Sequence, residues 1–203
     1  MSRPVHPEPV KFKSVTWGEV ESHCATIAED VKRRVGRIDA IIGILRGGWV
    51  PARLLSDYLG VGTVGVIEVK FYRGVGEHGE RPVVTQPLTL DIRDKVVLVV
   101  DDVADTGKTL NVAVSFLTLY GPKRLYTATL YLKPWSIIRP DFYAETTDAW
   151  IIFPWDKAET VEELVEKRGK SLEEVAGIIG DGVNFVRRIY LTRKAGAGAA
   201  GDR

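Results

Sequence analysis

The chain has very little cysteine, methionine or side-chain amide. Its 203 residues contain one cysteine, Cys24, and one methionine at position 1. A single cysteine cannot form an intrachain disulfide, which excludes the disulfide-stabilised scaffolds of small secreted proteins. The amides are limited to Gln86, Asn111 and Asn184. Because such labile side chains are depleted in heat-adapted proteins, we expect a thermophilic source.

The chain also lacks a long apolar run and an excess of one charge. No stretch is long and apolar enough for a membrane span, and the N-terminus has no apolar run behind a basic start. We therefore expect a cytoplasmic protein without a membrane partner. The 28 Lys and Arg residues nearly balance the 27 Asp and Glu residues, leaving a formal charge of +1. Composition thus gives no sign of nucleic-acid binding as the main function.

Helical and strand patterns alternate along the chain. Residues 17–35 repeat apolar side chains at helical spacing, and further helices are expected at residues 51–59 and 110–120. Apolar or alternating segments predict strands at residues 38–45, 64–72, 96–100 and 124–132. This alternation predicts an α/β fold with an open, mostly parallel sheet flanked by helices. Residues 73–87 are rich in Gly, Pro and charge, and predict a mobile loop that acts as a lid.

The most informative segment is residues 96–109, which read VVLVVDDVADTGKT. Its first five residues are β-branched or leucine and predict a strand covered on both faces. Asp101 and Asp102 follow at the carboxyl end, where open α/β sheets bind ligands and carboxylates can accept hydrogen bonds from vicinal hydroxyls. The next turn supplies backbone N–H groups, two hydroxyls and a helix start near Thr109, which together suit phosphate. The segment therefore predicts a sugar-phosphate site.

Two other interpretations of this segment are possible. A Gly-Lys-Thr tripeptide also ends the P-loop of nucleoside triphosphatases, but that motif needs a glycine where this chain has Asp102. The P-loop interpretation therefore fails. Paired aspartates at a strand end can instead hold a divalent ion, as in response-regulator-like pockets. That alternative stays open, although it gives the Thr106–Thr109 turn no role.

The same residues resemble the signature of the type I phosphoribosyltransferases, which use 5-phosphoribosyl-1-pyrophosphate (PRPP), and specifically of their purine branch. Aspartate at position 105 is similar to the 6-oxopurine enzymes, since typical adenine enzymes have alanine there. The resemblance implies that Asp101 and Asp102 bind the ribose hydroxyls and Mg²⁺, directly or through water. It makes Asp105 the candidate catalytic base near N7. The 5-phosphate loop would consist of Ala104, Asp105, Thr106, Gly107, Lys108 and Thr109.

A second turn, Leu45-Arg46-Gly47-Gly48, follows the strand expected at residues 38–45. Taken alone it is typical of a tight turn with a solvent-facing arginine. Two glycines also allow backbone N–H groups to approach a ligand closely. The resemblance implies that Leu45, Arg46 and Gly47 bind pyrophosphate, with a cis peptide between Leu45 and Arg46.

Residues 148–156, DAWIIFPWD, resemble the base-binding segment of bacterial xanthine-guanine phosphoribosyltransferases. The resemblance implies that Trp150 stacks on the purine and that the Ile151 backbone and Asp156 read the purine edge. Lys133 matches the lysine that hydrogen-bonds the 6-oxo group in that family. The alternative is that the aromatic residues of this segment form a core cluster.

The resemblance ends near Asp156. We expect a phosphoribosyltransferase core over residues 1–156, whose segment 133–156 binds the base. Residues 157–194 predict a small C-terminal appendage of three helices, with Ser171 and Glu174 forming a capping box. Residues 195–203 predict a disordered tail.

The helical appendage looks like that of crenarchaeal adenine phosphoribosyltransferases, so the base expected here is narrowly adenine, with AMP as product. The alternative acceptor is a 6-oxopurine: guanine, xanthine or hypoxanthine. Either enzyme would transfer phosphoribosyl from PRPP to N9 of the purine and release pyrophosphate, with Mg²⁺ as cofactor and a homodimer as the usual assembly. A pyrimidine or other base is a further option. A rival from another class is a PRPP-sensing regulator whose C-terminal helices bind nucleic acid, but six glutamates crowd the first two of those helices.

Overall fold

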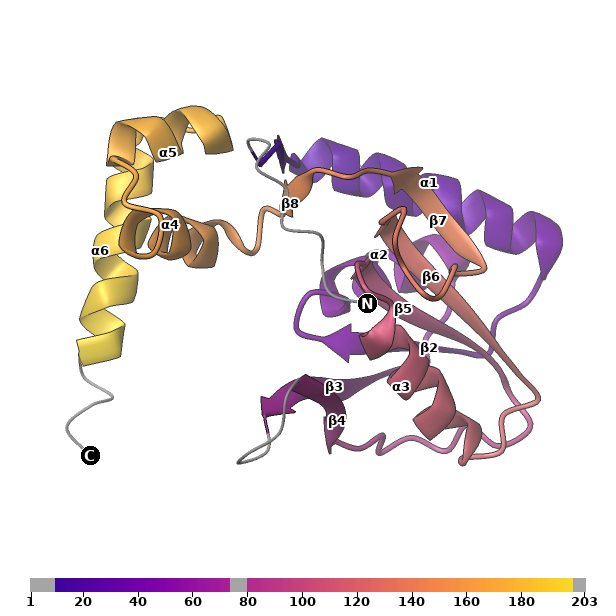
Figure 1. Cartoon of the computed structure of the whole chain (residues 1–203). Helices are drawn as coiled ribbons and strands as arrows, with labels where there is room; N and C mark the ends of the chain where they lie inside the picture. The colour runs from indigo at the N-terminus through magenta and orange to yellow at the C-terminus, as the bar shows by residue number, and fades with distance from the viewer. Residues whose placement is uncertain (1–9, 74–79, 199–203) are drawn as a thin grey trace. The chain divides into compact units, whose positions relative to one another are not determined.

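The computed structural model describes residues 10–73 and 80–198, and internal contacts divide the chain into two units (Figure 1). The larger unit is Gly18–Thr147. The smaller unit combines Met1–Trp17 with Asp148–Arg203. This division differs from the expected boundary at Asp156, because the N-terminal segment pairs with the residues that follow position 147.

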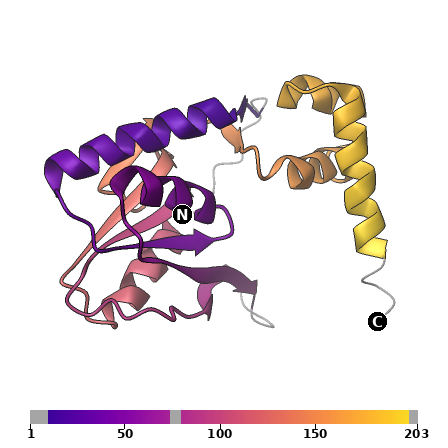
Figure 2. The same cartoon turned by 180° about the vertical axis from the view of Figure 1, so that it is seen from behind.

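The larger unit is built on a six-stranded sheet with the order β4-β3-β2-β5-β6-β7. All neighbouring strands are parallel except β3 and β4, which are antiparallel. Helices α1 and α2 cover one face of the sheet and α3 covers the other (Figures 1 and 2). The α/β fold with a mostly parallel sheet is therefore confirmed. The bounds are α1 Trp17–Arg34, β2 Ala40–Leu45, α2 Trp49–Leu59, β3 Val64–Arg73, β4 Glu80–Gln86, β5 Val96–Ala104, α3 Lys108–Thr118, β6 Arg124–Leu132 and β7 Phe142–Thr146.

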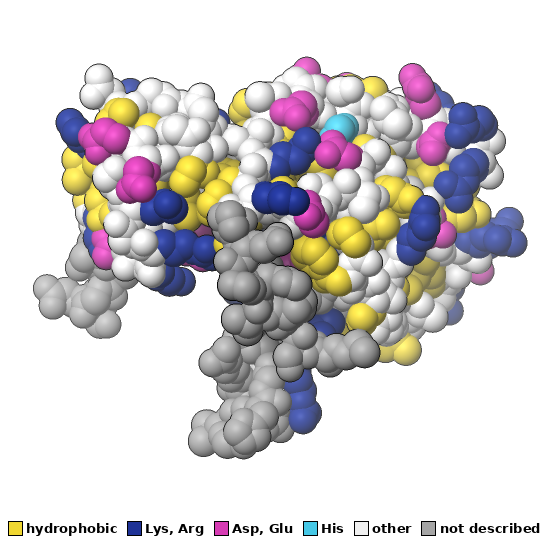
Figure 3. All heavy atoms as spheres, turned by 45° about the horizontal axis from the view of Figure 1, so that its top comes forward, with side chains coloured by type: hydrophobic (Ala, Val, Ile, Leu, Met, Phe, Trp, Pro, Cys, Tyr) yellow, Lys and Arg dark blue, Asp and Glu magenta, His cyan; other side chains and the backbone are white. Residues whose placement is uncertain are grey.

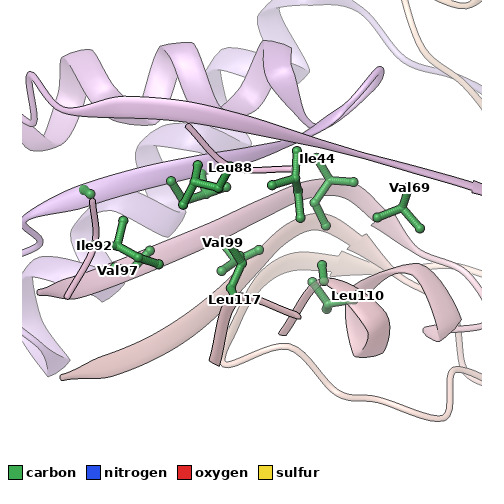
Figure 4. Packing of buried hydrophobic residues seen from close by; sticks show 12 residues of the cluster. Ile44, Val69, Leu88, Ile92, Val97, Val99, Leu110 and Leu117 are labelled. Atoms are coloured by element: carbon green, nitrogen blue, oxygen red, sulfur yellow. The ribbon is translucent and has the colours of Figure 1, made fainter. Parts of the chain in front are cut away.

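The core on the α3 face explains why β5 occupies the middle of the sheet. Val97 and Val99 of β5 are fully buried and pack with Leu110 and Leu117 of α3 (Figure 4). Their neighbours Leu98 and Val100 point to the opposite face and are buried as well. A strand covered on both faces needs the unbroken apolar run found at residues 96–100.

Two elements of the larger unit differ from the sequence-based expectation. Residues 80–86, expected within a loop, form the edge strand β4, with its antiparallel register running from Arg73 opposite Glu80 to Glu68 opposite Gln86. Pro82 is tolerated there because an edge strand does not need every N–H for pairing. Strand β7 was also not expected. The rest of the predicted loop, residues 74–79, lies outside the described residues.

The smaller unit joins a two-stranded parallel sheet to three helices. Strand β1, Phe12–Ser14, pairs with β8, Trp150–Ile152. The three expected appendage helices are present as α4 Lys157–Glu166, α5 Leu172–Ile179 and α6 Val183–Gly198. Helix α6 continues past Ala195, so the first part of the predicted disordered tail is helical. Residues 199–203 lie outside the described residues.

Local sequence signals and one apolar cluster hold the smaller unit together. The capping box is confirmed: Ser171 Oγ accepts from the Glu174 N–H at 3.1 Å, and the Glu174 carboxylate accepts from the Ser171 N–H at 2.8 Å. Val161, Val175 and Val186, one from each helix, are fully buried in a shared cluster with Ile152 of β8. In the part of the chain that the structure describes, no helix has the length and apolarity that a membrane span requires.

Candidate active site

The turns after β2 and β5 meet at one edge of the sheet. These strands are parallel neighbours, with Gly43 opposite Val100, so their carboxyl ends lie side by side. A β-carbon built on Gly47 would lie 1.8 Å from Asp102 Oδ2 and 2.6 Å from Asp102 Cγ. The absence of a side chain at Gly47 therefore allows the Asp102 carboxylate to occupy this position. The turns after β2 and β5 therefore lie against one another at this edge.

Gly48 brings the start of α2 directly against both strands. A β-carbon there would lie 2.5 Å from the Val100 carbonyl oxygen and 2.7 Å from that of Ile44. Because these are backbone atoms, they cannot swing away from a side chain. The Leu45–Arg46 peptide is cis, as expected for a pyrophosphate-binding turn. Arg46 is exposed, and Gly47 precedes α2 by two positions.

Asp101 and Asp102 have different environments. Successive strand residues point to opposite faces, and Asp101 is only 9% exposed while Asp102 is half-buried. Burial raises the pKa of Asp101 well above its ordinary value, and the charge of Asp102 raises it further. The Asp102 N–H, which donates to Asp101 Oδ1 at 3.0 Å, opposes that shift. Asp102 is therefore the more accessible anion at this edge.

The predicted anion loop lies between β5 and α3. Gly107 has φ 78°, a left-handed conformation that glycine adopts without a steric penalty. It is the N-cap of α3 and has no side chain to accept from the N–H groups of the first helical turn. Thr106 is exposed, and its Oγ1 accepts from the Lys108 N–H at 3.4 Å. Helix N-terminal N–H groups and flanking hydroxyls form the environment in which proteins bind phosphate.

A segment after β6, residues 133–138, is fastened to this loop by backbone bonds. The Lys133 N–H donates to the Ala104 carbonyl at 3.0 Å, and the Ile137 N–H donates to the Thr106 carbonyl at 3.1 Å. A β-carbon on Gly107 would lie 2.7 Å from Ser136 Oγ, so the segment covers the loop closely. These contacts place Lys133 directly beside the predicted phosphate site.

Within this segment, Trp135 links two of the predicted site residues. Its indole N–H donates to Asp105 Oδ1 at 2.9 Å. The Lys133 ammonium lies 5.6 Å from the centroid of the Trp135 ring, within the range of a cation–π contact. Lys133 is 6% exposed, which is unusual for a lysine and contradicts a simple solvated charge. Sequence reasoning singled out Lys133 and Asp105 but missed Trp135.

The remaining predicted base-binding residues belong to the smaller unit. Trp150 is half-buried and packs against the helical cluster, and the Arg168 guanidinium lies 5.8 Å from its ring centroid. Ile151 pairs with Lys13 in the β1–β8 register. Asp156 is the N-cap of α4, and its carbonyl accepts from the Thr160 N–H at 2.9 Å. The alternative of an aromatic cluster fits Phe153 and Trp155, whose rings stack at 4.7 Å.

Three basic residues of α6 form ion pairs within the smaller unit. Arg193 contacts Glu162 at 2.6 Å, Lys194 contacts Glu166 at 3.1 Å, and Arg187 lies 3.9 Å from Glu173. Figure 3 shows basic and acidic side chains intermixed over the helical unit. A regulator that binds nucleic acid needs positive charge directed at phosphates. These pairs reduce the charge that α6 could offer to such a partner.

Comparison with known proteins decides the family. The family model described as a phosphoribosyl transferase domain matches residues 16–165, which include both turns, Lys133 and the predicted base-binding segment. The chain belongs to the phosphoribosyltransferase family. The resemblance to the type I purine branch is confirmed, and with it the expectation of a PRPP-dependent purine phosphoribosyltransferase.

Relatives and solved structures agree on this family. A xanthine-guanine phosphoribosyltransferase of Gluconobacter oxydans is 30% identical over 167 residues, covering 81% of this chain and 96% of its own. One from Cereibacter sphaeroides is 38% identical over 121 residues, covering 59% of this chain and 70% of its own. The crystal structure of a purine phosphoribosyltransferase from Pyrococcus horikoshii is 43% identical, with a TM-score of 0.65, covering 71% of this chain and 94% of that one.

These relatives correct the expected base. The sequence-based lean toward adenine was wrong, because the similar curated enzymes are named for xanthine and guanine. The expectation of adenine rested on the helical appendage, which does not indicate which substituents of the purine are recognised. The structure offers a physical reason for the correction. Lys133, the lysine predicted to meet the 6-substituent of the purine, is a buried cationic donor, and a donor complements a carbonyl oxygen, not an amino group.

Proposed function

We propose that this protein transfers the phosphoribosyl group of PRPP to N9 of a 6-oxopurine, giving a purine nucleoside 5-monophosphate and pyrophosphate. The observation that carries the proposal is the junction between Lys133 and the anion loop through the Ala104 carbonyl. That bond connects Lys133, the proposed donor to the 6-oxo group, with the loop that is proposed to bind the 5-phosphate. Groups at both ends of the nucleotide product would therefore be bound by directly connected residues. The names of the similar enzymes support the same acceptor class.

The proposed PRPP site uses the carboxyl edge of the sheet. N–H groups of the loop at residues 104–109 and the hydroxyls of Thr106 and Thr109 would bind the 5-phosphate. Asp102, and Asp101 behind it, would accept hydrogen bonds from the ribose hydroxyls. The turn formed by Leu45, Arg46 and Gly47 would bind pyrophosphate through its N–H groups and the Arg46 guanidinium.

Mg²⁺ would enter this site with PRPP. Within residues 10–73 and 80–198, no group of three or more His, Cys, Asp or Glu side chains is placed to hold a metal. Mg²⁺ often uses only one or two carboxylates together with water and phosphate oxygens. The hard, half-buried carboxylate of Asp102 fits that requirement. Bound Mg²⁺ would neutralise the charge that develops on the leaving pyrophosphate.

The proposed chemistry forms a bond from N9 to C1 of the ribose while the bond from C1 to pyrophosphate breaks. The transition state has oxocarbenium character at C1, and the purine must lose a proton. Asp105 would accept or stabilise that proton near N7. Trp150 would stack on the purine, and the Ile151 backbone and Asp156 would contact its edge. Holding N9 in line with C1 in this way can lower the barrier by several kcal/mol.

Assembly and thermal adaptation remain predictions. A homodimer would cover apolar side chains near the turn after β2, where Trp49 is 40% exposed. Sedimentation and thermal unfolding measurements would test these two expectations.

The proposed function is tested by incubating the protein with PRPP, Mg²⁺ and one of four bases: guanine, xanthine, hypoxanthine or adenine. We expect the 6-oxopurines to be converted to their 5-monophosphates with stoichiometric pyrophosphate, and adenine to react slowest. Formation of AMP faster than any 6-oxopurine nucleotide would contradict the proposed acceptor. Salt-dependent binding to duplex DNA without nucleotide formation would instead support the regulator.

A further inference from the structure

Trp135 makes two different contacts at the predicted site. Its indole N–H donates to Asp105 Oδ1 at 2.9 Å. Its ring lies 5.6 Å from the Lys133 ammonium. One side chain therefore contacts both groups that are proposed to meet one edge of the purine, Lys133 at the 6-oxo group and Asp105 near N7.

The exposure of Trp135 argues against a purely structural role. Its side chain is 45% exposed, whereas the large side chains of the core are almost completely buried. A tryptophan at such a position contributes less to stability than a core aromatic residue, because much of its apolar surface still faces water. The specific feature of the residue here is its N–H donor, which phenylalanine and leucine lack.

The hydrogen bond fixes the orientation of the Asp105 carboxylate. Trp135 engages Oδ1, and this bond leaves Oδ2 as the oxygen that can accept a proton. A carboxylate that accepts a hydrogen bond on one oxygen loses rotational freedom. The backbone bonds from Lys133 to Ala104 and from Ile137 to Thr106 hold the segment that carries Trp135 against the loop.

We infer that Trp135 is a positioning residue for this reaction: its N–H orients the general base Asp105, and its ring face holds the Lys133 ammonium toward the 6-oxo group. The inference rests on the proposed function, and it adds a residue that neither the sequence pattern nor the resemblance assigned. It also separates two effects. Loss of the N–H alters the proton step, and loss of the ring also alters recognition of the purine.

The test compares Trp135→Phe, which keeps a ring without the N–H, with Trp135→Leu, which removes both. Ile137→Ala is the matched control, because Ile137 is 67% exposed on the same segment and its backbone N–H makes the bond to Thr106. With guanine and saturating PRPP, we expect Trp135→Phe to lower kcat about tenfold with the KM for guanine nearly unchanged, the usual size of a hydrogen bond to a charged group. Trp135→Leu should in addition raise that KM by about fivefold. Ile137→Ala should match the wild type.

A double-mutant cycle with Asp105→Asn shows whether Trp135 acts through Asp105. If it does, adding Trp135→Phe to Asp105→Asn causes no further loss of kcat. A Trp135→Phe kcat within twofold of the wild type would overturn the inference, as would an undiminished tenfold loss in the Asp105→Asn background. Failure of the proposed function is distinguishable, since the wild type would then make no guanosine monophosphate at all.

A second measurement does not depend on the folding or activity of the Trp135 variants. The chain has five tryptophans, so an amide spectrum of ¹⁵N-labelled protein contains five indole N–H signals. Spectra of the five single Trp→Phe variants identify the Trp135 signal, by elimination if that variant is unstable. We expect this signal to shift in Asp105→Asn and to stay in place in Ile137→Ala. An unmoved signal in Asp105→Asn would overturn the inference.

Discussion

Gly47 and Asp102 occupy adjoining positions at the carboxyl edge of the sheet, although 55 positions separate them in the sequence. The Asp102 carboxylate lies where a β-carbon of residue 47 would be, with Oδ2 only 1.8 Å from that point. The turn that is proposed to bind pyrophosphate and the carboxylate proposed to bind ribose are therefore sterically coupled. A change in one must displace the other.

Gly47→Ala tests this coupling. The added methyl group forces the Asp102 carboxylate to rotate away, so we expect the KM for PRPP to rise by at least tenfold. The KM for the purine should change little, because Lys133 and Asp105 lie on other elements. The control is Gly62→Ala, since Gly62 has open space around its β-carbon position. Steady-state kinetics measures both variants, and equal KM values for PRPP in Gly47→Ala and Gly62→Ala would refute the coupling.

Asp101→Asn should make the stability of the protein less sensitive to pH. Burial and the charge of Asp102 raise the pKa of Asp101 in the folded state, so folding favours its protonated form. That contribution is complete below the unfolded-state pKa of about 4 and is lost as pH rises through the raised folded pKa. Asparagine stays neutral and can still accept from the Asp102 N–H.

Urea unfolding at a series of pH values measures this effect. The difference in unfolding free energy between Asp101→Asn and the wild type should grow in favour of the variant as pH rises from about 4. It should approach a constant value above the folded pKa. A difference that does not vary with pH would mean that Asp101 has no raised pKa.

Asp105→Asn should lower kcat by about a hundredfold, in line with the usual effect of a general base. Asparagine preserves the size of the side chain and an oxygen acceptor for the Trp135 N–H. PRPP affinity should be nearly retained, because the 5-phosphate is proposed to bind to the loop N–H groups and not to the Asp105 carboxylate. Turnover and PRPP binding, measured separately by kinetics and calorimetry, check both parts. An unchanged kcat would remove the catalytic role of Asp105.

Trp150→Leu should raise the KM for guanine by roughly tenfold or more, because stacking on an aromatic ring contributes about 1 to 3 kcal/mol per base. Arg168→Ala, which removes the cation over the Trp150 ring, should have a smaller effect in the same direction. Phe185→Leu in α6 serves as the control and should leave this KM unchanged. Equal KM values for Trp150→Leu and the control would assign Trp150 to the helical cluster alone.

Sequence patterns predicted the central strands and the turns after β2 and β5, because each of these features is encoded by a short, continuous segment. The apolar, β-branched run before Asp101 is typical of a buried strand, and the small residues that follow it favour a tight turn before α3. Residues 80–86 gave no such signal, because an exposed edge strand needs no continuous apolar face. Strands β1 and β8 are three residues each and pair across more than a hundred positions, so neither is recognisable alone.

The part of the site that the sequence did not reveal depends on tertiary contacts. Trp135 follows Lys133 by two positions, yet its bond to Asp105 exists only because residues 133–138 fold onto the anion loop. The identity of the base was misjudged for a related reason. The helical appendage is conspicuous in the sequence, whereas the buried state of Lys133 becomes visible only in the folded sheet.

The central claim is that a sugar phosphate binds where β5 passes into α3, and a crystal structure with PRPP and Mg²⁺ tests it most directly. We expect the 5-phosphate to contact the N–H groups of residues 104–109, with a ribose hydroxyl within hydrogen-bonding distance of the Asp102 carboxylate. Electron density for PRPP at another position, with side chains filling the loop, would contradict it.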